Sequence, residues 1–354
     1  MSEPAAPRAP AIGAGWSVDV AASWGAQRAA DPIDDAELPM PPPAQAPLPT
    51  LRRVVTPGPD PFAHPAEREF SRLLSYYRVR WVYEPTSFAL AWDERGRAVE
   101  CFTPDFYLPD HHLYIELTTM RQRLVTRKNR KMRLLREIYP DVRIKLLYRR
   151  DFARIAEVFP QPDELDRPVR IGRVVFPEAA IRARLDRIAA DLAADLAPVD
   201  PAEPPLLLGV GREPCRFCEA IANRLRQHGL TLPRDRIDVS RYRLQASAAT
   251  VAVRRPPAAP LAGRHVIVVT DMINTGLTLA YLWEWLRRKG AAQITGCALL
   301  SRDSARLIDT PVRHIGFEAP DEPLAGWGLR LRRQYRELPY IAAIELDDDI
   351  APNC

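Results

Sequence analysis

Apolar and polar positions alternate regularly from about residue 62 onward, and their spacing predicts which segments form helices and strands. Residues 64–77 repeat apolar side chains at helical spacing, as an amphipathic helix does. Alternating stretches then predict strands at 79–85, 87–92, 98–109 and 113–119. A basic helix is predicted over 124–139 and a further strand over 141–150. This order indicates an α/β domain spanning residues 61–160.

The second half of the chain alternates strand and helix patterns more strictly. Strands are predicted at 170–176, 204–210, 237–244, 266–269, 294–302 and 312–320, with helices over 177–195 and 215–229 and after residue 276. Strands that alternate with helices are typical of a parallel sheet covered on both faces. We therefore expect a second α/β domain over residues 168–346.

Composition changes this picture mainly at the ends of the chain. Residues 1–60 are rich in Ala and Pro and predict a disordered tail, and residues 347–354 form an acidic tail. The five cysteines show no disulfide framework, and Cys215 and Cys218 lack the further ligands that zinc needs. The N-terminus has no apolar signal core, and no apolar run is long enough to span a bilayer. We expect a cytoplasmic protein with no membrane contact.

The segment HVIVVTDMINTGLTLAYLWEWLRR, residues 265–288, carries the clearest chemical signal. Its apolar strand ends in the turn Asn274-Thr275-Gly276-Leu277-Thr278, which opens a helix. Backbone amides at a helix N-terminus suit a phosphate, and the glycine lets the backbone close on the ligand. Ligands bind at this end of the strands in open parallel sheets, so a phosphate site is expected. The plainer alternative is a strand-turn-helix in which the glycine serves packing.

Residues from about 170 to 345 resemble the hypoxanthine-guanine phosphoribosyltransferase family. VIVVTDMINTGLTL resembles its signature for phosphoribosyl pyrophosphate, LLLGVGREP the loop for the pyrophosphate end, and residues 314–344 the hood over the purine. The resemblance implies a parallel sheet with flanking helices and a small hood, transfer of ribose 5-phosphate to a purine, and Mg²⁺.

The same resemblance implies roles for individual residues. Thr275, Gly276 and Thr278 would hold the 5′-phosphate, with Asn274 and Leu277 completing the turn. Asp271 would lie at the ribose hydroxyls, and Arg212 near the pyrophosphate.

Several positions depart from the family pattern. Thr270 stands where the signature has the first of two adjacent acids. Asn274 replaces the acid that meets the purine N7 proton, and an amide takes no proton at neutral pH. The aromatic stacking position falls on about Pro323, with Trp327 nearby, and a metal-side aspartate falls on about Arg330. These replacements predict a site that binds phosphoribosyl pyrophosphate or a purine nucleotide and transfers poorly.

A second group of acids occurs in the first half, in FTPDFYLP and LYIELTT. Neighbouring strands of this kind bring Asp105 and Glu116 to one point, and two carboxylates make an oxygen site for Mg²⁺. Such an ion activates water and stabilises a pentacovalent phosphate. Pro104 and Asp105, followed by Glu116, resemble the PD-(D/E)XK nuclease superfamily over residues 62–155. This resemblance implies a restriction-endonuclease-like α/β fold.

Thr118 stands where this superfamily pattern has a lysine that orients the attacking water. Lys128 on the next helix is the expected substitute, with Lys131 less favoured. Glu67, on the preceding helix, matches an extra acid that often occurs there, and Glu69 is its alternative. The plainer interpretation is that the acids only end a turn and a strand and bind no metal.

Basic residues crowd the predicted helix 124–139 and its approach. They are Arg121, Arg123, Arg127, Lys128, Arg130, Lys131, Arg133 and Arg136. Such a run predicts salt-sensitive binding of nucleic acid without sequence specificity, and a solvated basic face is the ordinary alternative. The net charge of +5 is too small to decide between them.

Three functions fit these patterns. The first is a purine-salvage phosphoribosyltransferase with an appended nuclease-like module. The second is a metal-dependent nuclease gated by a sensor of phosphoribosyl ligands, and the third is a non-catalytic nucleic-acid-binding regulator. A homo-oligomer is compatible with each. Asn274 disfavours the first and Thr118 the second, while the basic helix suits the second and third.

Overall fold

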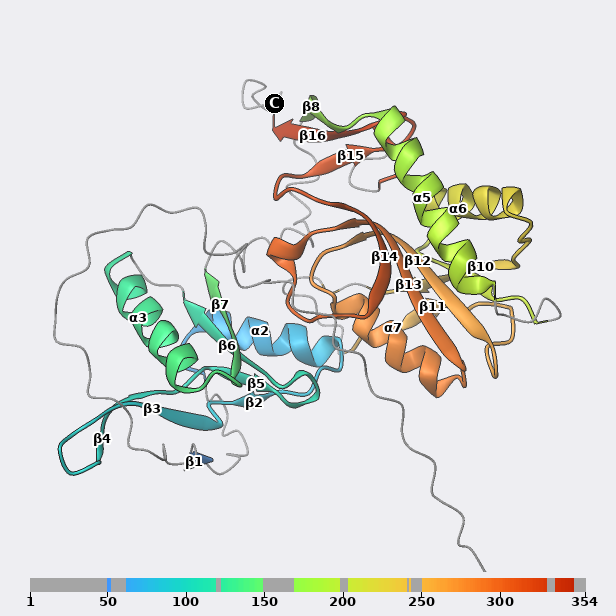
Figure 1. Ribbon diagram of the computed structural model, residues 1–354. Coiled ribbons are helices and arrows are strands. Elements are labelled where there is room, and N and C mark those ends of the chain that lie inside the picture. The colour runs from blue at the N-terminus through green and yellow to red at the C-terminus, as the bar shows by residue number, and fades with distance from the viewer. Residues whose placement is uncertain are drawn as a thin grey trace, which may run out of the picture. The chain divides into compact units, whose positions relative to one another are not determined.

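The computed structural model describes residues 50–51, 62–118, 122–148, 169–197, 203–240, 242, 250–329 and 335–346 (Figure 1). All of these lie in one compact unit, residues 39–354, and the other unit, residues 1–38, is outside the described part. We call residues 62–148 the N-terminal module and residues 169–346 the C-terminal module. The predicted boundary at 160–168 and the predicted acidic tail at 347–354 fall outside the described residues.

The N-terminal module is built on a mixed sheet in the order β2-β5-β6-β7. These strands are Val82–Tyr83, Phe106–Leu108, Leu113–Thr118 and Arg143–Tyr148. Strand β5 runs antiparallel to β6, and the short helix η1, Pro109–His111, joins them. Strand β7 runs parallel to β6, so the chain must cross over between them, and helix α3, Gln122–Ile138, forms that crossover.

Helix α2, Pro65–Tyr76, precedes this sheet and starts where the sequence predicted. His64 caps it through its ring nitrogen, and the Glu67 carboxylate accepts from the His64 amide, which makes a capping box. The apolar face of α2 is buried with Phe70, Leu73 and Leu74 in the core of the module.

A second sheet, β1-β3-β4, consists of Thr50–Leu51, Thr86–Trp92 and Ala98–Phe102. Helix α3 covers it with a separate apolar cluster that includes Phe88, Phe102 and Leu135. The prediction that residues 1–60 are disordered is wrong at Thr50–Leu51, because antiparallel pairing with β3 gives this backbone partners that composition does not foresee. The other residues of that predicted tail lie outside the described residues.

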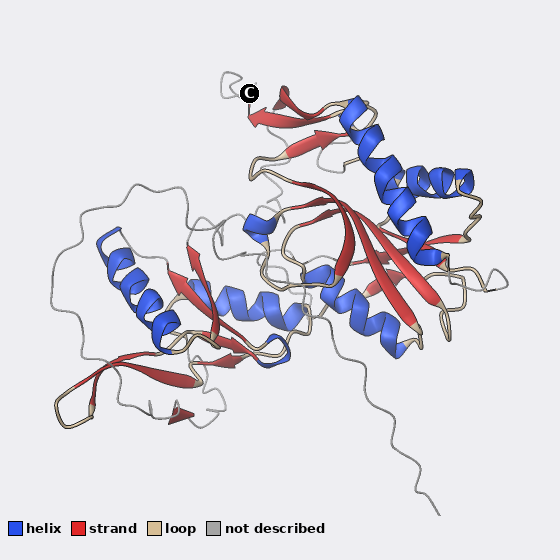
Figure 2. Cartoon of the chain, viewed as in Figure 1, coloured by secondary structure: helices blue, strands red, loops and turns tan. Residues whose placement is uncertain are grey.

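The C-terminal module has a six-stranded sheet in the order β11-β10-β9-β12-β13-β14 (Figure 2). These strands are Val253–Arg255, Arg234–Val239, Leu206–Val210, His265–Ile273, Gln293–Ser301 and Val312–Glu318. All neighbours pair in parallel except β10 and β11. The predicted parallel sheet is therefore confirmed, with an antiparallel strand at one edge.

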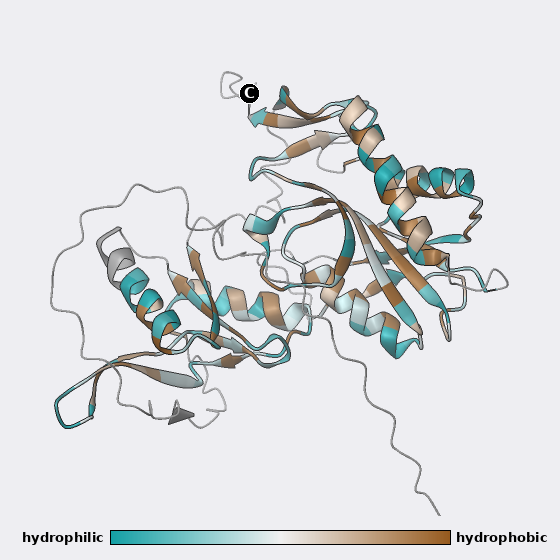
Figure 3. Ribbon diagram, viewed as in Figure 1, coloured by the Kyte–Doolittle hydropathy of each residue, from teal (hydrophilic) through white to brown (hydrophobic). Residues whose placement is uncertain are grey.

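Helices cover both faces of this sheet because alternate residues of a strand point to opposite faces. Ile267 and Val269 of β12 pack with helices α5, Glu178–Leu196, and α6, Arg216–Gln227. Val266 and Val268 pack instead with helix α7, Leu277–Arg288. The hydrophobic colouring of these strands in Figure 3 matches burial on both faces.

A small antiparallel sheet, β15-β16-β8, corresponds to the expected hood. The predicted bounds 314–344 are wrong at residues 314–318, which belong to β14 of the parallel sheet. Its strands are Leu324–Gly326, Ile341–Leu346 and Val169–Phe176. Strand β8 was predicted to open the parallel sheet, and that is wrong. Its pairing partner, β16, lies far along the chain, so local alternation could not reveal the correct sheet.

One cluster of buried apolar side chains includes residues of both modules. Phe70 and Tyr76 of α2 and its C-cap residue Tyr77 belong to it together with Val251 and Leu282 of the C-terminal module. We call this shared core the seam. It indicates that the two modules share part of their hydrophobic core.

Candidate functional site

The turn predicted to hold phosphate lies between β12 and α7, at the carboxyl end of a central strand. Gly276 caps the helix with φ +83°, in the left-handed region that favours glycine. The Leu277 amide donates to Thr275 Oγ1 at 3.3 Å. Within the described part of the chain, the amides of Thr275, Gly276 and Thr278 have no such acceptor. Three donors at a helix N-terminus therefore remain for an anion.

The carbonyl side of the turn is fixed by residues 306–309, which we call the brace. The Thr275 carbonyl accepts from the amides of Leu307 and Ile308 at 3.0 and 3.1 Å. A Cβ at Gly276 would lie 2.3 Å from the Ile308 carbonyl oxygen, closer than real atoms approach. The brace and the turn therefore fit together only with glycine at this position.

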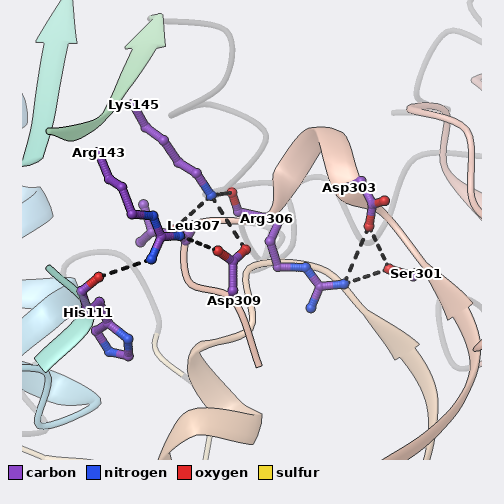
Figure 4. Close-up of polar contacts among 8 residues, drawn as sticks. All are labelled: His111, Arg143, Lys145, Ser301, Asp303, Arg306, Leu307 and Asp309. Atoms are coloured by element: carbon purple, nitrogen blue, oxygen red, sulfur yellow. Dashed lines mark hydrogen bonds and ion pairs between the residues drawn. The ribbon is translucent and has the colours of Figure 1, made fainter. Parts of the chain in front are cut away.

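The brace begins with a partly buried arginine that is hydrogen-bonded to the end of β13 (Figure 4). Arg306 Nη2 donates to Ser301 Oγ at 2.5 Å and lies 3.6 Å from the Asp303 carboxylate. Ser301 Oγ in turn donates to Asp303 at 2.7 Å. Asp303 belongs to the short helix η3, Asp303–Ala305. This network, through the brace, supports the turn that was predicted to hold phosphate.

Asp271 accepts a hydrogen bond from Cys215, which lies between β9 and α6. Cys215 Sγ lies 2.9 Å from Asp271 Oδ1, and it also accepts from the Cys218 amide at 3.3 Å as the cap of α6. Burial raises the pKa of the Cys215 thiol, and the Asp271 carboxylate raises it further, so the thiol keeps its proton and donates. The sequence indicated only that Cys215 lacks the further ligands of a zinc site, although its position at the start of a predicted helix was visible.

Two other predicted residues lie around this sheet edge. Asn274 Oδ1 is buried and has no hydrogen-bond partner among the described residues, which favours a ligand group there. Arg212 is exposed in the loop after β9, the parallel neighbour of β12, so it stands at the same edge as Asp271. Its carbonyl accepts from Arg236 at 3.0 Å.

The hood residues differ in their availability to a base. Trp327 has φ +46° and is buried, and the Arg216 guanidinium carbon lies 5.0 Å from the centre of its ring. Arg216 therefore occupies one face of this indole. Pro323, at the expected stacking position, is exposed, and Arg330 lies outside the described residues.

The acids of the N-terminal module meet between β5, β6 and α3. The Asp105 amide donates to Glu116 Oε2 at 3.2 Å, and Asp105 Oδ2 accepts from the Leu117 amide at 2.6 Å. Lys128 Nζ lies 2.5 Å from Glu116 Oε1 and donates to the Leu117 carbonyl at 2.8 Å. We call Asp105, Glu116 and Lys128, with Glu67, the acid cluster.

Glu67 lies close enough to the other acids to affect their charge. It raises the pKa of both Asp105 and Glu116 through its own charge. Its Oε2 accepts from Tyr83 at 2.8 Å and from the Ala63 amide at 3.0 Å. The alternative acid, Glu69, instead contacts the Tyr242 hydroxyl. The structure thus brings together the four residues that the sequence selected.

The acid cluster places three carboxyl groups beside one lysine, and two of these acids, Asp105 and Glu116, resist ionisation. Burial raises the pKa of Asp105 to about 8, and the neighbouring Glu116 carboxylate adds to the shift. Burial also raises the pKa of Glu116. Thr118 Oγ1, at the end of β6, is buried with no hydrogen-bond partner in the described part. Acids whose pKa values are strongly raised cluster at functional sites in proteins, so this cluster is a candidate site.

Among the described residues, metal-binding clusters of three or more side chains and membrane-spanning helices are both absent. None of their groups of three or more His, Cys, Asp or Glu side chains has the arrangement of a metal site. None of their helices is both long and apolar enough to cross a membrane.

The basic residues of α3 are largely engaged within the module. Arg130 binds Glu100, Lys131 donates to the Cys101 carbonyl and Arg136 to the Ile144 carbonyl. Arg133 lies 3.8 Å from Glu137 and is exposed. Arg121 and the side chains of Arg123 and Arg127 lie outside the described part. The described basic side chains therefore give little support to a free nucleic-acid face.

Comparison with known proteins identifies the C-terminal module. Residues 178–331 match the family described as phosphoribosyl transferase domain. The chain is 30% identical over 176 residues to the hypoxanthine-guanine phosphoribosyltransferase of Bacillus subtilis, which covers 49% of this chain and 94% of the relative. It is 29% identical over 177 residues to the hypoxanthine phosphoribosyltransferase of Escherichia coli, covering 50% and 97%.

A crystal structure of a hypoxanthine-guanine phosphoribosyltransferase from Bacillus anthracis covers 50% of this chain and all of its own, with 23% identity and a TM-score of 0.45. The family match lies within the C-terminal module. Through that module, the chain belongs to the hypoxanthine-guanine phosphoribosyltransferase family.

Proposed function

We propose that the C-terminal module binds phosphoribosyl pyrophosphate or a purine nucleotide through the turn 274–278. The observation that carries this proposal is the set of free amides at Thr275, Gly276 and Thr278, which follow a strand that carries Asp271 near its carboxyl end. The amides would bind the 5′-phosphate, and Asp271, oriented by Cys215, would accept from the ribose hydroxyls.

The same site transfers a phosphoribosyl group slowly at best. Asn274 lies where a purine would need a proton acceptor, and a neutral amide accepts no proton at pH 7. An amide does donate a hydrogen bond, so it suits the unprotonated N7 of a purine nucleotide. The module therefore mainly binds the phosphoribosyl ligand or purine nucleotide and catalyses little transfer.

Titration calorimetry on the full chain with Mg²⁺ tests this function. Phosphoribosyl pyrophosphate and purine nucleotides are titrated separately, and we expect at least one to bind and Asp271→Ala to weaken it. Absence of heat from every one of these ligands would contradict the proposal.

Restoring the acid tests the assigned role of Asn274. We expect Asn274→Asp to raise nucleotide formation from phosphoribosyl pyrophosphate and hypoxanthine by about 100-fold, the scale of general acid-base help. Asn223→Asp, an exposed position on α6, is the matched control and should change nothing. An unchanged rate in Asn274→Asp would show that the missing acid does not limit transfer.

A second function is favoured by the acid cluster of the N-terminal module. We propose that this module is a PD-(D/E)XK-type nuclease that cleaves phosphodiester bonds with Mg²⁺. The carboxyl groups of Asp105 and Glu116 have pKa values raised by burial and by neighbouring carboxylates, which a divalent cation would relieve. The Leu117 carbonyl is a third oxygen nearby. Bound there, the ion would activate a water.

The chain's own residues would then have distinct roles. Asp105 and Glu116 would hold the ion, and Lys128, which reaches Glu116 from α3, would orient the attacking water in place of the lysine absent at Thr118. Glu67 would add negative charge from α2.

Plasmid and RNA substrates with Mg²⁺ or Mn²⁺ test this second function. We expect nicking or RNA cleavage that Asp105→Ala abolishes and Lys128→Met reduces strongly. Lys131→Met is the matched control, because this lysine also donates to a carbonyl but lies outside the acid cluster. Salt-sensitive binding without cleavage would instead favour the non-catalytic regulator.

A further inference from the structure

The N-terminal module contacts the brace, which supports the turn 274–278. Lys145 Nζ of β7 lies 3.3 Å from each of the carbonyl oxygens of Arg306 and Leu307 (Figure 4). Arg143 Nη2, on the same strand, lies 2.6 Å from Asp309 Oδ2. Two cations of one strand thus contact three of the four brace residues.

The contact removes the Lys145 ammonium group from water in part, which a chance surface contact would not do. Its ammonium group is partly buried, and burial lowers its pKa. Two carbonyls accept its hydrogen bonds, and the Asp309 carboxylate lies 3.8 Å away. A buried ammonium without such partners would be strongly unfavourable, so the contact is specific.

The brace residues that contact Lys145 are also hydrogen-bonded to the turn 274–278. The Leu307 carbonyl accepts from Lys145, and the amide of the same residue donates to the Thr275 carbonyl. The Ile308 amide donates to that carbonyl as well. The Ile308 carbonyl lies against Gly276. Two bonded steps therefore separate Lys145 from the amides proposed to bind phosphate.

Lys145 also lies next to the acid cluster in the pairing of β6 with β7. In the parallel register of β6 and β7, Lys145 lies opposite Ile115, and Leu146 lies opposite Glu116. A shift of β7 must therefore move the backbone that carries Glu116, since a ladder of hydrogen bonds joins the two strands.

A second contact joins the two modules through α2. The Tyr76 carbonyl accepts from the Val251 amide at 2.8 Å, and the Tyr76 hydroxyl donates to Ser240 Oγ at 2.7 Å. Glu67 of the acid cluster lies on this helix. The seam adds apolar packing between α2 and the C-terminal module.

We propose that ligand binding at the turn 274–278 is coupled to the acid cluster through the brace, Lys145 and the β6–β7 pair. This inference rests on the proposed binding of a phosphoribosyl ligand. It makes that ligand a regulator of metal binding at Asp105 and Glu116. Because coupling between two binding sites is reciprocal, the metal must change the affinity for the ligand by the same factor.

Hydrogen exchange of the full chain, with and without phosphoribosyl pyrophosphate, tests the route. We expect the ligand to slow exchange in residues 274–279, in the brace, and also in β6 and β7. In Lys145→Met the ligand should still protect 274–279 but no longer protect β6 and β7. Lys131→Met, which keeps every brace contact, should behave like the natural chain.

The outcomes separate this inference from the function beneath it. Protection of 274–279 without any change in β6 and β7 would overturn the coupling and leave ligand binding intact. Absence of protection at 274–279 would remove both. Titration of Mn²⁺ adds a second measure: we expect about a fivefold or larger change in its affinity when the ligand is present, lost in Lys145→Met. An unchanged factor in that variant would contradict the proposed route.

Discussion

At the residue scale, short sequence patterns located the acid cluster because two of its acids lie on or beside strands that are adjacent in both the sequence and the sheet. Asp105 directly precedes β5 and Glu116 lies within its partner β6, so their closeness follows from the register. Lys128 reaches them from the one crossover helix. Cys215 and Lys145 were missed as functional residues. Their partners, Asp271 and the brace, lie 56 and more than 160 positions away, and only the tertiary fold brings such groups together.

The protonation of Asp105 gives a testable pH dependence of stability. Its pKa rises from 3.8 to about 8 on folding, so the folded chain keeps a proton that the unfolded chain loses. The resulting stability is complete below pH 3.8 and is lost as pH rises through 8. We expect Asp105→Asn to unfold with a free energy about 1–3 kcal/mol higher than the natural chain at pH 8, and an equal one near pH 4.

Urea denaturation without divalent ions at the two pH values measures this difference. Added Mg²⁺ should reverse the order at pH 8, because the ion stabilises the ionised carboxylate of the natural chain alone. A variant that is less stable than the natural chain at pH 8 without ions would show that Asp105 is not strained by burial.

At the element scale, the sequence predicted most helices and strands but not which sheet each strand joins. The apolar runs of β9 and β12 indicated a parallel sheet correctly, because burial on both faces leaves a direct mark on composition. Strand β8 carries no comparable mark, and its hood position depends on β16. The short strand β2, Val82–Tyr83, occupies only part of the run predicted over 79–85.

The contact between the turn and the brace predicts the effect of adding one methyl group. We expect Gly276→Ala to lower the free energy of unfolding by at least about 2 kcal/mol, since it adds a clash with the Ile308 carbonyl to an unfavourable φ of +83°. Gly263→Ala, with φ +73° and open space around its Cβ, should cost only about 1 kcal/mol.

Chemical denaturation of both variants separates backbone strain from the clash. Binding of phosphoribosyl pyrophosphate should weaken in Gly276→Ala and stay normal in Gly263→Ala. Equal losses of stability in the two variants would mean that the brace yields readily and does not fix the turn.

At the scale of the whole molecule, the seam and the brace join two modules that the sequence suggested were separate. Local patterns gave two domains because each has its own order of strands and helices. The apolar residues of α2 that pack across the seam look like ordinary core positions in the sequence. Nothing in their spacing distinguishes packing within a module from packing between modules.

Shared packing predicts that the modules unfold together. Differential scanning calorimetry of the full chain should give one transition whose calorimetric and van't Hoff enthalpies agree. Val251→Ala, which shortens a seam residue that is 1% exposed, should lower the midpoint and keep a single transition. Two resolved transitions in the natural chain would show that the modules are energetically independent.

The distribution of thiols has a practical consequence for measuring this protein in cell extracts. Cys101 is exposed, whereas Cys215, Cys218 and Cys297 are buried and burial raises the pKa of each. A maleimide reagent will therefore modify Cys101 at once and reach those three only in molecules that have opened. Mass spectrometry of the alkylated chain then counts opened molecules directly, without purification or an activity assay.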